Sequence, residues 1–160
     1  MTTNELMRND WVKLAGTNIF CRVDRIDADS ISGVTASGSR FEQKISKFEA
    51  IALDRDILLR TSMWLASGKV FRKIVARKVG FEYNLDIHRL EVLIDGASQR
   101  NMHYGIWALH QLQHLYRHYS QGEELSVNIL HNKAKEYNRV FYEERRKPDM
   151  TNQNTISNDE

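Results

Sequence analysis

The chain has one cysteine, one proline and no long apolar run, and each scarcity excludes a class of protein. Cys21 stands alone, so no internal disulfide can form, and the composition fits a reducing compartment. No window approaches the roughly 18 uninterrupted apolar residues of a membrane helix. The first residues are polar and lack the apolar core of a secretory signal. We therefore expect a cytoplasmic protein with no membrane partner.

Catalytic motifs are equally scarce. The sequence contains no glycine-rich phosphate loop, no nucleophile elbow and no pair of closely spaced cysteines. Cys21 lies in an apolar run, which is typical of a small core residue rather than a nucleophile. Asp24, Asp27 and Asp29 share one turn, but they lack the ligand spacing and the final glutamate of a calcium loop. We expect no enzyme activity and no cofactor.

What is present is the composition of an ordinary globular protein. Apolar residues make up 41% of the 160 residues and charged residues 28%, with a net charge of +2. This length suits one compact domain, or two small subdomains that share a core. We expect its three tryptophans, Trp11, Trp64 and Trp107, to be core anchors.

The first third of the chain reads as a meander of short strands. Apolar and polar residues alternate over 10–14, 19–26, 30–35 and 40–45, with turn residues between these segments. A short sheet of this kind buries its apolar face and protects its edges by bending around on itself. We predict a small β-barrel of the Src-homology-three type over residues 8–53, closed by a last strand at 51–53.

The sequence pattern over residues 54–127 predicts an α+β layer. Asp54 can cap a short helix that ends at 60 or 61, and strands are predicted at 70–75, 81–85 and 90–94, with a turn at Asp95-Gly96. A main helix follows at 106–119 and packs on one face of this small antiparallel sheet. Its buried face is predicted from the helical spacing of Leu109, Leu112, Tyr116 and Tyr119.

Beyond this layer we predict an added helix over 128–147 and a disordered tail over 148–160. Pro148 ends the helix, and the residues after it are polar. Residues 126–129 fit either an edge strand or the beginning of that helix.

The main helix also carries a sequence signature, which is His110-Gln111-Leu112-Gln113, then Leu115-Tyr116, then Gly122-Glu123-Glu124-Leu125. It resembles the closing signature of a family of small uncharacterised proteins from Bacteroidetes genomes and from their phages and mobile elements. Asn9-Asp10-Trp11-Val12 and Ile51-Ala52-Leu53 stand where that family has a strand opening and a helix start. The family usually has proline where this chain has Ala52, and asparagine where it has His114. The resemblance implies a fold and a mobile-element origin, and it implies no activity.

His110, His114 and His118 repeat every fourth residue, so neighbouring pairs share a helical face. Such a pair can bind zinc or nickel, which keeps a metal-dependent enzyme as one hypothesis. No carboxylate lies on the same ridge as a third ligand, so surface or hydrogen-bonded histidines are the favoured interpretation and we predict no metal site.

One run of the chain is strongly basic, with Lys69, Arg72, Lys73, Arg77 and Lys78 and no acidic residue among them. Cations interleaved with apolar residues can present one strand face to phosphates, so these five residues are candidates for nucleic-acid binding. The alternative is an edge strand that lysine and arginine guard against aggregation. The small net charge favours this edge-strand interpretation.

Three hypotheses of function follow. The first is a non-catalytic binding or adaptor protein of phage or mobile-element origin that contacts a host or phage protein through the barrel or the C-terminal helix. A homo-oligomer through that helix is an open alternative. The second is a nucleic-acid-binding protein that uses the basic run, and the third is the metal-dependent enzyme.

Overall fold

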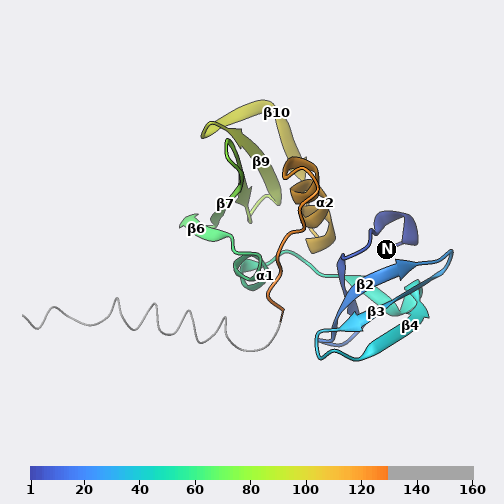
Figure 1. Ribbon diagram of the computed structural model, residues 1–160. Helices are drawn as coiled ribbons and strands as arrows, with labels where there is room; N and C mark the ends of the chain where they lie inside the picture. The colour runs from blue at the N-terminus through green and yellow to red at the C-terminus, as the bar shows by residue number, and fades with distance from the viewer. Residues whose placement is uncertain (130–160) are drawn as a thin grey trace, which may run out of the picture. The chain divides into compact units, whose positions relative to one another are not determined.

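The computed structural model describes residues 1–129, with the backbone alone for residues 99–101. These residues belong to one compact unit (Figure 1). They form two five-stranded antiparallel sheets and one main helix, so the predicted α+β class is confirmed. None of the helices in this part of the chain combines the length and the apolar character of a membrane span.

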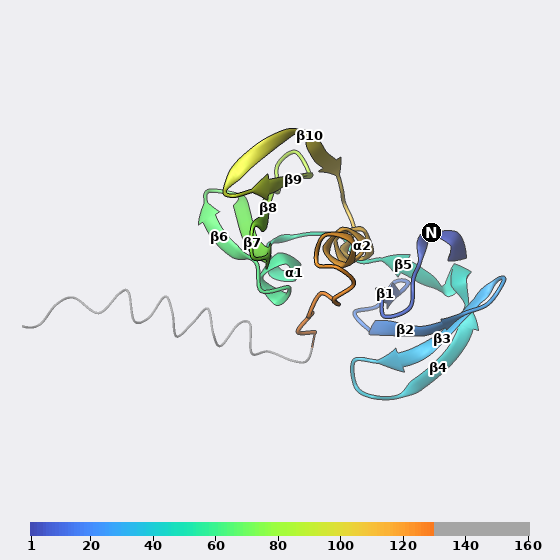
Figure 2. The ribbon, with the colours of Figure 1, turned by 45° about the horizontal axis from the view of Figure 1, so that its top comes forward.

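The first sheet contains the four strands predicted near the N-terminus and a fifth. In chain order they are β1 (Trp11–Leu14), β2 (Phe20–Ile26), β3 (Ser30–Thr35), β4 (Arg40–Lys44) and β5 (Phe48–Ala50). Figures 1 and 2 show the sheet, whose order is β4-β3-β2-β1-β5. Short 3-10 helices precede β1 (Thr3–Glu5) and β5 (Ile45–Lys47). Inward-facing strand residues and Leu6, which precedes β1, form a small apolar cluster made of Leu6, Val12, Cys21, Val23, Ile31 and Phe48.

The predicted closing strand at 51–53 is wrong. The fifth strand is Phe48–Ala50, and it pairs with β1. No pairing joins β5 to β4 among residues 1–129, so hydrogen bonds do not close this sheet into a barrel. Ile51 and Leu53 instead enter the core under the second sheet, and Ala52 forms an isolated bridge with Ala108. Their alternation reflects burial against that core rather than membership of the first sheet.

The second sheet follows a short helix, α1 (Arg55–Arg60), which begins where the sequence predicts. The Asp54 carboxylate caps α1 by accepting a hydrogen bond from the Ile57 amide at 2.8 Å. The strands are β6 (Trp64–Ser67), β7 (Val70–Ala76), β8 (Val79–Asn84), β9 (Arg89–Ile94) and β10 (Ala97–Gly105), in the order β10-β9-β8-β7-β6. The three predicted strands are confirmed as β7, β8 and β9.

The prediction missed the two edge strands of this sheet. β10 is polar and shows no alternation, but Asp95 and Gly96 both have positive φ, of 50° and 80°, which is the geometry of a tight hairpin turn. That turn brings the chain back along β9, and Ala97 pairs with Ile94. β6 has only four residues, and its backbone pairs with β7 from Trp64 to Ser67.

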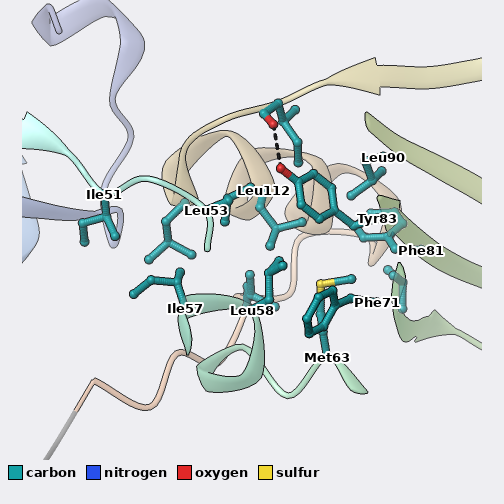
Figure 3. Packing of buried hydrophobic residues seen from close by; sticks show 14 of the residues in the cluster. Ile51, Leu53, Ile57, Leu58, Met63, Phe71, Phe81, Tyr83, Leu90 and Leu112 are labelled. Atoms are coloured by element: carbon teal, nitrogen blue, oxygen red, sulfur yellow. Dashed lines mark hydrogen bonds between the residues drawn. The ribbon is translucent and has the colours of Figure 1, made fainter. Parts of the chain in front are cut away.

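The main helix, α2, runs over Leu109–Tyr119 and therefore begins three residues later than predicted. Ala108 keeps an extended conformation because it pairs with Ala52. Leu109 and Leu112 are fully buried, whereas Tyr116 and Tyr119 are partly buried against the same cluster. Figure 3 shows this core, in which Leu112 from α2 lies among side chains of α1 and the sheet, including Ile57, Leu58, Phe71, Phe81 and Tyr83.

The described chain continues past α2 without regular structure. Residues 126–129 form neither a strand nor a helix, so both alternatives predicted for them are wrong. Arg60 holds this segment instead, because its carbonyl accepts from the Asn128 amide at 2.8 Å. The rest of the predicted helix over 128–147 and the predicted tail over 148–160 lie outside the described residues. The subdomain boundary at 53/54 stays a prediction.

Candidate functional site

The basic run lies on β7 and on the turn that leads to β8. β7 lies between β6 and β8, so the interpretation as a guarded edge strand is wrong. Phe71 and Val75 point into the core, while Arg72 and Ile74 are exposed. The strand therefore divides its side chains between the apolar core and the outer face of the second sheet.

Three cations of the run already have acidic partners. Lys69 Nζ lies 2.6 Å from Asp86 Oδ1. Arg72 donates to Glu82 on β8, with a closest N···O distance of 2.6 Å. Lys78 lies in the turn between β7 and β8, and its Nζ is 3.6 Å from Oδ1 of Asp95 in the turn between β9 and β10. All three pairs are on the surface, where each contributes about 0–1 kcal/mol and can exchange its partner.

Lys73 has a structural role. Its ammonium group donates to the Thr61 carbonyl at 2.9 Å and lies 5.6 Å from the centre of the Tyr116 ring. Burial lowers the pKa of Lys73 from its ordinary value. This side chain therefore ties β7 to α1 and α2 and does not face a phosphate on the outer surface.

Arg77 is exposed, and within the described part of the chain it makes no ion pair. The five predicted residues therefore differ in their surroundings. Three have acidic partners, Lys73 is hydrogen-bonded within the fold, and Arg77 makes no ion pair in the described part of the chain. The structure does not assemble them into one continuous cationic track.

The outer face of the second sheet holds a shallow hollow beside this strand. Ile74 on β7 pairs with Gly80 on β8, which pairs with Leu93 on β9. Gly80 has no side chain, so a depression of about 280 Å³ opens between its two neighbours. Trp64 and Arg72, which pair across β6 and β7, form another part of its wall. Arg77 and Lys78 also line it.

The apolar side chains of the hollow are unusually open to solvent. Ile74 is 70% exposed and Trp64 is 47% exposed. The expectation that all three tryptophans are core anchors is therefore wrong for Trp64, and also for Trp107, which is 56% exposed. Trp11 is partly buried and packs against the larger core. Only the strand register places Trp64 on the outer face, because it pairs with the exposed Arg72.

The first sheet carries a second hollow, of about 390 Å³. Polar and charged side chains dominate its lining, which consists of Asp24, Ser32, Gly33, Arg40, Phe41 and Glu42. It lacks an exposed large apolar side chain. It is therefore the weaker candidate for a contact surface.

The histidine ridge on α2 does not converge on a metal site. His114 Nε2 hydrogen-bonds to Asp10 Oδ2 at 2.7 Å, and the Asp10 carboxylate is completely buried. His110 is buried, and burial lowers its pKa from the ordinary value. His118 is exposed and contacts the ring of Tyr119. Across the described residues, no three histidine, cysteine or acidic side chains are placed to hold a metal ion.

The signature on α2 instead joins the helix to the N-terminal strand. The Gln113 side chain accepts from the Trp11 amide at 3.0 Å and donates to the Asn9 carbonyl at 3.0 Å. Gln111 caps its own helix by accepting from the amides of Trp107 and Ala108. These residues have packing and capping roles in this fold.

The end of the signature has a similar role. Glu124 pairs with Arg117 at 2.8 Å, and Arg117 also donates to the Arg8 carbonyl at 3.1 Å and lies 3.7 Å from Asp10. Leu125 is buried in the larger core. Gly122 has a φ of 97°, which allows the chain to turn after α2.

In comparisons with protein-family models, with curated proteins and with solved structures, nothing matches this chain. The interpretation of the site therefore rests on its geometry.

Proposed function

We propose that this protein is a non-catalytic binding module that contacts a protein partner through the outer face of its second sheet. The resemblance of the α2 signature to proteins of phages and mobile elements supports a host or phage protein as the partner. The contact surface consists of Trp64, Ile74, Leu93, Arg72 and Arg77, and we call it the β7 face.

The observation that carries this proposal is the exposure of Ile74 and Trp64 beside the hollow at Gly80. The solvent face of an antiparallel sheet is ordinarily polar, whereas this one has an apolar centre and a cationic margin. Tryptophan and arginine are also the residues on which binding energy at protein interfaces most often concentrates. A contact role accounts for their position better than a folding role does.

Nucleic-acid binding through the basic run is the alternative. Its support is one exposed tryptophan next to exposed arginines, since bases stack on aromatic rings and phosphates attract cations. The ion pairs weigh against it, because phosphates would have to displace the carboxylates of Asp86, Glu82 and Asp95. Lys73 contributes nothing to such a track, because its ammonium group is bonded inside the fold.

We also propose that the first sheet curls into a partly open barrel of the Src-homology-three type, in which β4 and β5 are the two unpaired edges. Its order, β4-β3-β2-β1-β5, is that of a meander whose last strand returns beside the first, as in such barrels. A bulge between Val23 and Arg25 gives β2 the local bend that a curled sheet requires. The first sheet would then have a mainly structural role, and the proposed contact surface would lie on the second sheet.

The test compares proteins captured from a host lysate by the immobilised full-length chain and by two variants. Trp64→Ser combined with Ile74→Ser removes the apolar centre of the β7 face. Ile87→Ser is the matched control, because Ile87 is 57% exposed and does not line the hollow. We expect a defined protein to be lost with the double variant and retained with the control. Capture that is equal for all three proteins would contradict the proposal.

A second measurement addresses the alternative. Binding of labelled oligo(dT) and of a DNA duplex is followed by fluorescence anisotropy at low and high salt. Tight binding with a steep salt dependence would favour the nucleic-acid function.

A further inference from the structure

We infer that the hollow on the β7 face accepts an acidic peptide segment of the partner that inserts one apolar side chain beside a carboxylate. This inference rests on the proposed function and specifies the chemistry of its partner. Its evidence is the combination of an apolar floor with a cationic margin on one side.

The size of the hollow suits a side chain. Pockets for drug-sized ligands usually have volumes of about 300–1,000 Å³. The depression at Gly80, of about 280 Å³, is just below that range and is shallow. One large aliphatic or aromatic side chain, inserted between Ile74 and Leu93, would occupy much of it.

The floor is apolar because of the strand register. Ile74, Gly80 and Leu93 are neighbours across three strands. Val79 and Phe81 flank Gly80 along β8, but their side chains alternate to the core, so the outward apolar side chains of the floor are those of Ile74 and Leu93. An inserted apolar side chain would therefore remove apolar surface from water on both sides, which is the main source of affinity in a small contact.

At the edge of the hollow, the uncompensated positive charge among the described residues is that of Arg77. Glu82 balances Arg72 and Asp95 balances Lys78, but Arg77 has no acidic partner in the described part of the chain. A carboxylate on the peptide could bind the Arg77 guanidinium in the bidentate manner that arginine favours. The Lys78 pair is loose, at 3.6 Å, so a second carboxylate could share its ammonium group.

The same facts favour a peptide over a nucleic acid. A phosphate backbone follows a row of unpaired cations, whereas among the five residues of the basic run only Arg77 lacks an acidic or internal partner in the described part of the chain. Bases stack on flat aromatic platforms, whereas the three paired residues at the centre of the hollow, Ile74, Gly80 and Leu93, are two aliphatic residues and one glycine. One carboxylate next to one apolar side chain matches the arrangement more closely.

The test uses a library of random peptides displayed on phage and selected on the full-length protein. We expect the enriched peptides to combine a large apolar residue with neighbouring aspartate or glutamate. Their affinities are then measured with labelled synthetic peptides on the wild type and on three variants.

Gly80→Val is the first variant, because a β-branched side chain there would fill the hollow. A Cβ at Gly80 would meet the Lys73 carbonyl at 3.4 Å and the Leu93 side chain at 3.8 Å, which are ordinary contacts. Valine is also favoured in strands, so the fold should be kept. We expect binding to weaken at least about tenfold while the urea midpoint stays the same or rises.

Arg77→Glu is the second variant, and Lys69→Glu is its matched control within the same basic run. Lys69 does not line the hollow and is paired with Asp86. We expect about tenfold weaker peptide binding for Arg77→Glu and little change for Lys69→Glu.

The outcomes separate the inference from the proposed function. Enriched peptides that are neutral or basic, but that still lose binding with Gly80→Val, would overturn the inference and leave the contact function intact. A selection with no enrichment, or with peptide binding that Gly80→Val leaves unchanged, would overturn the inference, whereas the proposed function fails only if capture from the lysate is equal for the wild type and both of its variants. Oligo(dT) binding that is lost equally with Arg77→Glu and Lys69→Glu would assign the face to nucleic acid. Self-association that Gly80→Val abolishes would assign it to a second copy, and either result overturns the inference.

Discussion

Replacing Gln113 by leucine should loosen the N-terminal strand from α2. Gln113 is 1% exposed, and its amide group makes two backbone hydrogen bonds, both to the segment that enters β1. Leucine has nearly the same size but neither a donor nor an acceptor. The Trp11 amide and the Asn9 carbonyl would then lose their partners in a partly buried place.

The magnitude follows from these two groups. A backbone group left unpaired in the interior costs about 1–3 kcal/mol, and the lower end applies here because Asn9 and Trp11 are partly open to water. Two such groups cost about 2–4 kcal/mol, and the added apolar burial of leucine offsets roughly 1 kcal/mol. We expect the free energy of unfolding to fall by about 2 kcal/mol. In a chain of this size, this lowers the melting temperature by about 4–8 °C.

Gln111→Leu is the matched control, because it is the same substitution two residues earlier on the same helix. Gln111 accepts from the amides of Trp107 and Ala108 at the beginning of α2, where water can replace it at least in part. We expect a loss of at most about 1 kcal/mol.

The assay is urea unfolding of the full-length chain, combined with hydrogen exchange at the Trp11 amide. Gln113→Leu should lower the urea midpoint and raise the exchange rate of that amide, whereas Gln111→Leu should leave the exchange rate unchanged. The reasoning would be refuted if Gln113→Leu were as stable as the wild type, or if both variants lost the same stability.

Three further predictions concern stability. Gly33→Ala should prevent folding of the first sheet, because its Cβ would overlap the Arg22 carbonyl oxygen; a wild-type urea midpoint would contradict this. Burial lowers the pKa of His110, so below about pH 6.5 the unfolded chain binds more protons and the free energy of unfolding should fall. Urea midpoints at pH 7.5 and 5.5 should differ less for His110→Gln than for the wild type, and equal slopes would count against this. Asp54→Ala removes the cap on the Ile57 amide and should cost about 1 kcal/mol in urea unfolding, so a neutral result would show that water replaces the cap.

The sequence predicted the inner strands well because their side chains alternate with the burial of the sheet. β3 begins and ends where predicted, and of its two predicted anchors Ile31 is buried, whereas Val34, three residues later, is partly buried on the other face. The cap at Asp54 was also predictable, because capping is local and depends on residues close in sequence.

The edge strands were harder because pairing, and not side-chain pattern, determines them. The residues of β10 form a strand because the turn at Asp95-Gly96 returns them to β9. That turn was identified from the sequence, so extending the hairpin beyond it would have predicted β10. β6 offered no such signal in its four residues.

The candidate site depends on relations that no local pattern contains. Ile74, Gly80 and Leu93 are distant in sequence and meet only through the register of three strands. In the same way, the hydrogen bond between Asp10 and His114 joins two residues that are far apart in the sequence. The histidine ridge and the basic run were visible in the sequence. The sequence did not show which of their side chains already have hydrogen-bond or ion-pair partners within the fold.

The distribution of structural roles supports the functional proposal. The signature residues Gln111, Gln113 and Glu124 are engaged in contacts that hold α2 and the N-terminal segment. Each of these side chains therefore has a structural role within the described fold. Ile74 has no comparable role, because its side chain is mostly in water and the core below it is complete without it. Folding accounts for the signature and leaves the apolar centre of the β7 face unexplained, and the partner contact that we propose would give the aliphatic side chain of Ile74 a physical role there.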